Sequence, residues 1–89
     1  MPKKIVLYTK DYCPYCKRAK ALLTQKGVAF TNIEISSSPK LTEEMIEKAG
    51  GRRTVPQIFI DDLHIGGAED MFALERAGVL DEMLGLLTA

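Results

Sequence analysis

The pattern that most restricts the possible folds lies in the first 35 residues, where a strand, a helix and a second strand follow one another. Ile5-Val6-Leu7-Tyr8 is a continuous apolar, β-prone run, which is typical of a strand buried on both faces. Residues 14–26 carry apolar side chains at helical spacing, and Gly27 stands where a helix C-terminal glycine is expected. Residues 28–35 are predicted as a second strand. This order predicts two parallel strands joined by a right-handed crossover.

The middle of the chain predicts a second helix followed by a β-hairpin. Ser38-Pro39 is typical of an N-cap followed by a proline in the first helical turn, and Gly50-Gly51 is expected to end that helix. Residues 57–60 and 63–65 are predicted strands. The two-aspartate turn between them is so tight that the strands are expected to pair antiparallel.

The last part of the chain, after Gly66-Gly67, is again helical in its spacing, with an interruption at Gly78 and continuation to Leu87. The order β-α-β-α-β-β-α, with a short last helix, predicts an α/β fold whose mixed four-stranded sheet is flanked by helices. The 89 residues show no repeat, linker or low-complexity stretch, so we expect a single domain over residues 1–89.

Composition and charge argue against several classes of protein. Twelve basic and twelve acidic side chains give a formal net charge of zero, whereas nucleic acids and anionic membranes select a basic excess or patch. No apolar run approaches the roughly 20 residues that cross a bilayer, and the apolar part of the N-terminal segment is too short for an export signal. We therefore expect a cytoplasmic protein with no nucleic-acid or membrane partner. A stable structural disulfide is uncommon in that compartment.

The segment Cys13-Pro14-Tyr15-Cys16 has a cysteine spacing that serves either a dithiol redox pair or half of a zinc site. Structural zinc takes four ligands, and the chain adds one histidine, His64, which we expect on the surface of the hairpin; we therefore expect no metal. A buried structural pair is the remaining alternative, and Cys16 does fit the apolar stripe of its helix. Cys13, however, falls in the turn before the helix. A CxxC segment at a helix start within a βαβ unit favours redox chemistry.

The two cysteines are predicted to have different roles. The thiolate is the attacking species, and lowering a cysteine pKa by about three units requires roughly 4 kcal/mol. The helix dipole contributes only ~0.3–1 kcal/mol, so backbone N–H groups near Tyr15 and Cys16 are expected to stabilise a Cys13 thiolate. Lys10 is either a further positive charge or a solvated loop lysine. Cys13 is thus the predicted nucleophile, and Cys16 resolves the mixed disulfide.

Three motifs in this order resemble the glutaredoxins over essentially the whole chain: Cys13-Pro14-Tyr15-Cys16, Thr54-Val55-Pro56-Gln57, and Gly66-Gly67 followed by acidic residues. The Cys-Pro-Tyr-Cys form is most similar to the small bacterial dithiol glutaredoxins. The resemblance implies a thioredoxin fold and a cis peptide bond at Pro56. It also implies reduction of protein disulfides and glutathione-mixed disulfides, with glutathione as the electron source.

The same resemblance implies how glutathione is bound. The Val55 backbone is expected to pair with its cysteine portion, and the helix N-terminus after Gly66-Gly67 to receive its γ-glutamyl end. Asp70 is favoured over Glu69 for the ammonium group. The implied contact residues are Lys10, Tyr15, Thr54, Val55, Pro56, Gln57, Gly67, Ala68, Glu69 and Asp70.

The carboxylate of the glycine end of glutathione has four candidate partners. Lys10 and Gln57 match the family pattern, and at most one of Arg52 and Arg53 is expected to join them. We expect a monomer whose partners are glutathione and disulfide-containing or glutathionylated proteins.

Two other functions remain open at this point. A thioredoxin-like reductase recharged by a flavoenzyme has the same fold and the same cysteine spacing. A [2Fe–2S] carrier would use Cys13 of two protomers and two glutathione molecules. The iron-handling glutaredoxins typically carry a single cysteine in Cys-Gly-Phe-Ser, whereas this chain has a second cysteine at position 16.

Overall fold

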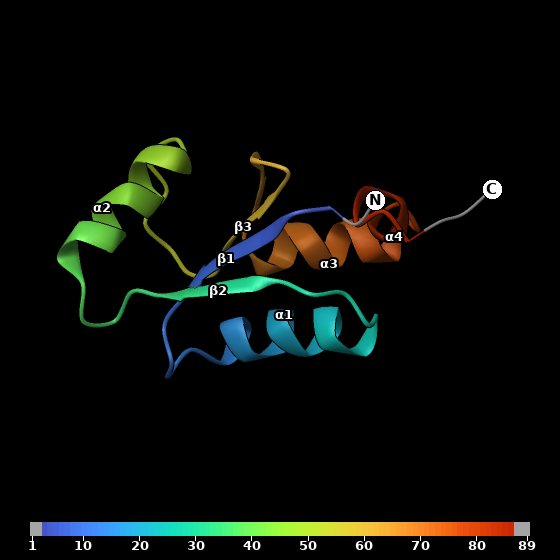
Figure 1. Cartoon of the computed structure of the whole chain (residues 1–89), viewed down its shortest axis with the longest axis horizontal. Helices are drawn as coiled ribbons and strands as arrows, with labels where there is room; N and C mark the ends of the chain where they lie inside the picture. Colours follow the sequence, from blue (N-terminus) through green and yellow to red (C-terminus); the bar gives the residue numbers. More distant parts are fainter. Residues whose placement is uncertain (1–2, 87–89) are drawn as a thin grey trace.

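The computed structural model describes residues 3–86, which form a four-stranded mixed sheet with helices on both faces (Figure 1). The strands lie in the order β2-β1-β3-β4, with β1 parallel to β2 and antiparallel to β3, and β3 antiparallel to β4. The predicted fold class and order of elements are confirmed. The bounds are β1 (Ile5–Thr9), α1 (Pro14–Gln25), β2 (Thr31–Glu34), α2 (Pro39–Lys48), β3 (Gln57–Ile60), β4 (Leu63–Gly66), α3 (Ala68–Arg76) and α4 (Leu80–Met83).

Short-range hydrogen bonds explain where the helices begin. Ser38 is the N-cap of α2, where its hydroxyl oxygen accepts the backbone N–H of Leu41 at 3.2 Å. Cys13 holds the same position before α1, and its sulfur accepts the backbone N–H of Cys16 at 3.4 Å. A proline follows each cap at the first helical position, as predicted.

Two boundaries differ from the prediction by more than one residue. Strand β2 begins only at Thr31, because the apolar Val28 and Phe30 pack against the core instead of pairing with β1. These two positions are therefore apolar because their side chains pack against the core outside the sheet. Helix α4 ends at Met83, and Leu87, which the spacing placed in the last helix, lies outside the described residues.

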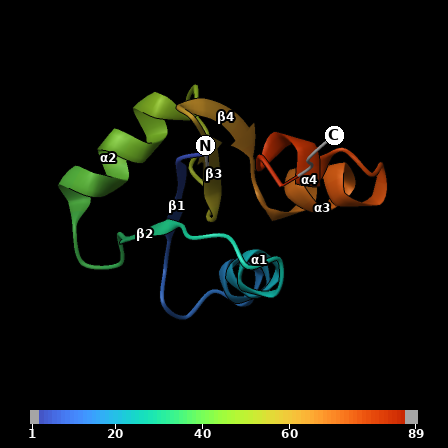
Figure 2. The ribbon, with the colours of Figure 1, turned by 45° about the vertical axis from the view of Figure 1, so that its right-hand side comes forward.

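Two apolar clusters lie on opposite faces of the sheet, because successive side chains of a strand point to opposite sides. Leu7 packs with residues of α1, α3 and α4, such as Leu23, Met71 and Leu80. Tyr8, the next residue of β1, packs with α2. Figure 2 shows α2 standing apart from the other three helices. No helix within residues 3–86 is long and apolar enough to cross a membrane.

The sheet topology also brings two loops together. Tyr8, near the end of β1, lies opposite Gln57, the first residue of the antiparallel strand β3. The loop that follows β1 and the loop that precedes β3 therefore meet at the same end of the sheet.

Candidate active site

The two cysteines lie at the start of α1, with different exposure to solvent. Cys13 is half-buried, and Cys16, one turn into the helix, is completely buried on the same stripe as Ala19 and Leu23. Both are free thiols. The predicted difference in exposure is therefore present. A disulfide substrate can approach the sulfur of Cys13, whereas the protein shields the sulfur of Cys16 from solvent.

The same environments shift the two thiol pKa values in opposite directions. Burial opposes ionisation of Cys13, but hydrogen bonds from the backbone N–H and thiol of Cys16 and from the backbone N–H of Tyr15 favour its thiolate. Together with the charge of Lys10, they hold the pKa of Cys13 below its ordinary value. Burial raises the pKa of Cys16 to about 11, and the hydrogen bond and charge of Cys13 act in the same direction. Cys13 therefore ionises first.

The loop before β3 lies against the half-buried cysteine. The Val55–Pro56 peptide bond is cis, which confirms the conformation implied by the family resemblance. The carbonyl oxygen of Val55 accepts the thiol of Cys13 at a Sγ–O distance of 3.7 Å. Pro56 is buried, and Thr54 is exposed. The backbone of this loop thus contacts the Cys13 sulfur from a distant part of the sequence.

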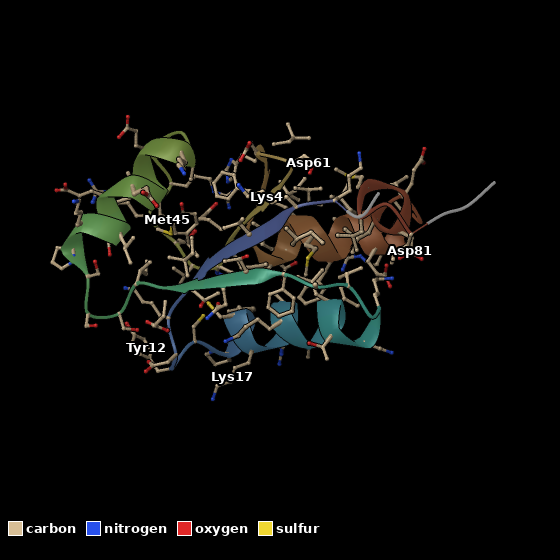
Figure 3. All side chains as sticks on the ribbon, viewed as in Figure 1. Lys4, Tyr12, Lys17, Met45, Asp61 and Asp81 are labelled. Atoms are coloured by element: carbon tan, nitrogen blue, oxygen red, sulfur yellow. The ribbon has the colours of Figure 1, made fainter. Side chains whose placement is uncertain are left out.

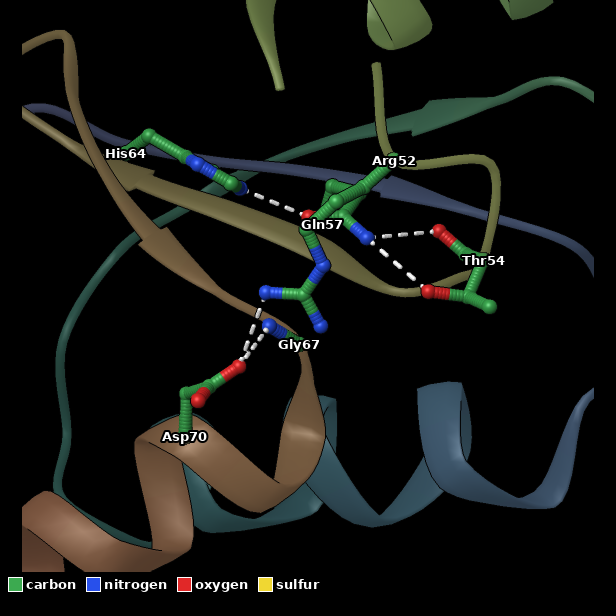
Figure 4. A network of polar contacts seen from close by, with 6 residues as sticks. All are labelled: Arg52, Thr54, Gln57, His64, Gly67 and Asp70. Carbon is green, nitrogen blue, oxygen red and sulfur yellow. Dashed lines mark hydrogen bonds and ion pairs between the residues drawn. The ribbon is translucent and has the colours of Figure 1, made fainter. Parts of the chain in front are cut away.

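A buried polar network holds this loop against the hairpin (Figure 4). Gln57 is fully buried, and its Nε2 donates to the Thr54 carbonyl oxygen at 2.9 Å and to the Thr54 hydroxyl at 3.1 Å. Its Oε1 lies 2.6 Å from Nε2 of His64. The polar atoms of Gln57, a candidate for glutathione contact, are therefore engaged inside the protein.

His64 differs from its expected place on the surface. The side chain is half-buried, because its ring stacks at a tilt on Phe59 with 5.0 Å between the ring centroids and its Nε2 meets Gln57. Burial lowers the pKa of His64, and the positive charge of Arg52 acts in the same direction. One signal in the sequence pointed to this contact: Gln57 is a polar residue at the start of an otherwise apolar strand.

The first turn of α3 forms a second polar group of the site. Asp70 Oδ2 accepts the backbone N–H of Gly67 at 2.8 Å and forms an ion pair with Arg52 Nη1 at 3.1 Å (Figure 4). A side chain at Gly66 would collide with this carboxylate, since a Cβ there would lie 2.3 Å from Asp70 Oδ2. Glu69 is exposed. Arg52, a candidate for the glycine end of glutathione, thus lies at the N-terminus of α3.

A pocket of about 160 Å³ lies between these two loops. It brings together most of the predicted contact residues and adds Arg52, whereas Lys10 and Gln57 do not line it. Its walls are formed by Tyr15, Arg52, Thr54, Val55, Pro56, Gly67, Ala68, Glu69 and Asp70. A larger hollow of about 600 Å³ lies on the α2 face of the sheet, away from both cysteines. Within residues 3–86, no three His, Cys, Asp or Glu side chains are grouped so that they could hold a metal ion.

Helix α1 and the loop before it carry exposed aromatic and cationic side chains, among them Tyr12 and Lys17 (Figure 3). Tyr12 and Tyr15 are among the large exposed apolar residues. The ammonium group of Lys10 lies 6.0 Å from the ring centroid of Tyr12, and the guanidinium group of Arg18 lies 5.7 Å from that of Tyr15. Each cation lies at the distance of a cation–π contact.

Comparison with known proteins gives one consistent family. The glutaredoxin family model matches residues 5–65. Glutaredoxin 3 of Escherichia coli (strain K12) is 54% identical over 80 residues, which cover 90% of this chain and 95% of that protein. The solution structure of a glutaredoxin from Brucella melitensis has a TM-score of 0.83 at 46% identity and covers 99% of this chain and 95% of its own. The buckwheat glutaredoxin–glutathione complex has a TM-score of 0.84 at 34% identity, over 93% and 77% of the two chains.

Proposed function

This chain belongs to the glutaredoxin family of thiol–disulfide oxidoreductases, and from that premise we propose that glutathione is its electron donor. Its substrates are then glutathione-mixed disulfides and protein disulfides. One observation carries the proposal: the pocket joins Val55, which contacts the Cys13 sulfur, to the first turn of α3 with its acidic Asp70. A related protein from buckwheat was solved as a complex with glutathione, which supports the same ligand.

For a glutathione-mixed disulfide, Cys13 alone carries the exchange. Its thiolate attacks the glutathione sulfur, the S–S bond breaks, and the substrate leaves as a thiolate that takes up a proton. A second glutathione thiolate then attacks the glutathione sulfur on Cys13. This step releases glutathione disulfide and regenerates the Cys13 thiolate.

For a protein disulfide, Cys16 is also required. Attack by Cys13 forms a mixed disulfide with the substrate, and this step removes the negative charge of Cys13. The part of the raised Cys16 pKa that comes from Cys13 is then lost. Cys16 deprotonates more readily and attacks the Cys13 sulfur, which releases the substrate thiolate and leaves a Cys13–Cys16 disulfide. Two glutathione molecules reduce that disulfide.

In this proposal the pocket orients glutathione by its cysteine portion and its γ-glutamyl end. The backbone of Val55 pairs with the cysteine portion, with Tyr15, Thr54 and Pro56 forming the wall around it. The backbone N–H groups at Ala68 and Glu69 receive the α-carboxylate of the γ-glutamyl end, and Asp70, which already accepts the Gly67 N–H, binds its ammonium group. Lys10 remains the candidate for the glycine carboxylate. The role of Gln57 is to hold the Thr54 loop in place.

A coupled assay tests the proposal. Reduction of a glutathionylated peptide is followed as NADPH consumption with glutathione and glutathione reductase, and separately with thioredoxin reductase. We expect turnover only in the first system, no turnover by Cys13→Ser, and retained turnover by Cys16→Ser. With a protein disulfide as substrate, Cys16→Ser is expected to lose activity as well.

Turnover with thioredoxin reductase alone would contradict glutathione as the donor. Loss of the mixed-disulfide reaction in Cys16→Ser, as complete as in Cys13→Ser, would contradict the assignment of separate roles to the two thiols.

A further inference from the structure

Arg52 reaches the active site through the loop that follows α2. Gly50 and Gly51 take φ values of +66° and +97°, in the region that glycine adopts readily, and turn the chain away from the helix. The guanidinium group then lies beside the first turn of α3, where Nη1 is 3.1 Å from Asp70 Oδ2 (Figure 4). Its Nη2 lies 3.4 Å from the point that a Cβ on Gly67 would occupy. The group therefore lies directly beside the backbone that begins α3.

The pocket consequently presents two opposite charges side by side. Arg52 is the only cationic side chain among the described residues that line it, and Asp70 and Glu69 are the acids. An α-amino-acid end carries an ammonium and a carboxylate group on one carbon atom. A cation and an anion a few ångströms apart match that arrangement, whereas an acid alone matches only its ammonium group.

The hydrogen bonds leave room for both ligand charges. Asp70 Oδ2 is shared by Gly67 N–H and Arg52, and within residues 3–86 the other carboxylate oxygen makes no hydrogen bond. An ammonium group can therefore bind Oδ1 without displacing the cap of α3. A guanidinium group has five N–H donors in a planar fork, so Arg52 can donate to a carboxylate beside Asp70.

We propose that Arg52 binds the α-carboxylate of the γ-glutamyl end of glutathione and is thereby a specificity residue for α-amino-acid ends, in contrast to the expected contact with the glycine end. The inference rests on the proposed use of glutathione. It adds Arg52 to the binding site and states which end of glutathione this residue contacts. Arg52 and Asp70 are each about half exposed, at 47% and 48% of the side chain, so water and salt weaken the contribution.

The experiment measures the equilibrium between Cys13 and a series of tripeptide disulfides in the full chain carrying Cys16→Ser. Glutathione is compared with 4-aminobutyryl-cysteinyl-glycine, which lacks the α-carboxylate, and with γ-glutamyl-cysteinyl-glycinamide, which lacks the glycine charge. Cystine, which lacks both flanking residues, is measured beside the three tripeptides. Each constant for mixed-disulfide formation is determined by mass spectrometry with Arg52 and with Arg52→Gln. Arg76→Gln, at the exposed end of α3, is the control for removing one positive charge.

We expect Arg52→Gln to lower the constant ~5-fold for glutathione and for the glycinamide, a factor that corresponds to about 1 kcal/mol. The factor is expected to fall to about 1 for the 4-aminobutyryl peptide. Arg76→Gln is expected to change none of the three constants.

Three results would overturn the assignment. A loss that disappears with the glycinamide places Arg52 at the glycine end. An unchanged or higher constant for glutathione in Arg52→Gln means that Arg52 pairs only with Asp70. If the chain with Arg52 shows no preference for glutathione over cystine, the proposed function itself fails and the assignment falls with it.

Discussion

Cys13 and Cys16 are the same residue type three positions apart, and their surroundings lower the pKa of the first thiol and raise the pKa of the second. Charge-assisted hydrogen bonds contribute ~1.5–3 kcal/mol each, more than the ~0.3–1 kcal/mol of a helix dipole. Burial opposes the Cys13 thiolate, and the N–H group and thiol of Cys16 and the N–H group of Tyr15 lower the pKa of Cys13 more than the charge of Lys10 does. Cys16 is fully buried, which keeps it protonated until exchange begins.

The two thiols can be titrated separately by alkylation. In Cys16→Ser, the rate of reaction with iodoacetamide is expected to rise with pH along a titration curve and then level off. The midpoint of this curve is expected to lie below the ordinary cysteine pKa. In Cys13→Ser, Cys16 is expected to react only at alkaline pH, with a midpoint above the ordinary value but below about 11, because burial remains while the influence of Cys13 is gone. Equal midpoints in the two variants would contradict the division of roles.

Helix α3 supplies both a wall of the pocket and its anion, and its first turn depends on Asp70. The carboxylate accepts the N–H of the N-cap residue Gly67, which otherwise has no partner within its own helix. The same group faces the pocket. One side chain therefore contributes to the stability of the element and to the proposed recognition of the ligand.

The Asp70 cap makes the stability of the protein depend on pH in a specific way. The hydrogen bond from Gly67 and the ion pair with Arg52 hold the pKa of Asp70 below its ordinary value. Its contribution is therefore full above the unfolded-state pKa near 4 and is lost as pH falls through the lower folded-state value. Asp70→Asn is expected to lower the free energy of unfolding by about 1 kcal/mol at pH 7, with the difference shrinking below pH 4.

The measurement is chemical denaturation from pH 2.5 to 7. Glu69→Gln is the matched control, because it removes the same charge from the same turn and leaves the cap intact. A difference between the protein and Asp70→Asn that persists unchanged to pH 2.5 would argue against a role for the carboxylate charge.

At the scale of the whole molecule, the site is assembled from three loops that the fold brings to one end of the sheet. Helix α2 lies on the other face, and the Tyr8 hydroxyl on β1 donates to Glu44 Oε2 on α2 at 2.7 Å. This bond ties α2, the helix that precedes the Arg52 loop, to β1. Burial, together with Glu44, raises the pKa of Tyr8 to about 12.

The stabilising contribution of Tyr8 is consequently expected to decline at high pH. A group whose folded-state pKa is raised contributes fully below its unfolded value, near 10 for tyrosine, and loses that contribution as pH rises toward about 12. Tyr8→Phe is expected to be less stable at pH 8, because the hydrogen bond is gone, and to approach the stability of the unmodified chain between pH 10 and 11.5. Denaturation of the reduced protein over this range tests it, and a constant difference would contradict the expected titration.

Features that depend on a few neighbouring residues were predictable from the sequence. The cap at Ser38, followed by a proline, rests on a hydrogen bond across three residues, and the residue types alone indicate it. The cap at Cys13 was not predicted. The strand and helix order follows from the apolar spacing. The cis bond before Pro56 followed from the family resemblance and is confirmed. The two roles of the cysteine pair, inferred from its spacing at a helix start, stay a prediction.

Contacts between distant segments were decided by the tertiary structure. The Arg52–Asp70 ion pair and the Gln57–His64 hydrogen bond join residues 18 and 7 positions apart. The polar Gln57 stands out in an apolar strand, but no local pattern identifies its partner, and the ion pair has no local signal. The start of β2 was also set by packing, because Val28 can bury its side chain in a strand or against the core. A sequence determines which hydrogen bonds a segment can make with itself; only the packed sheet decides which charges and amides from separate loops share one pocket.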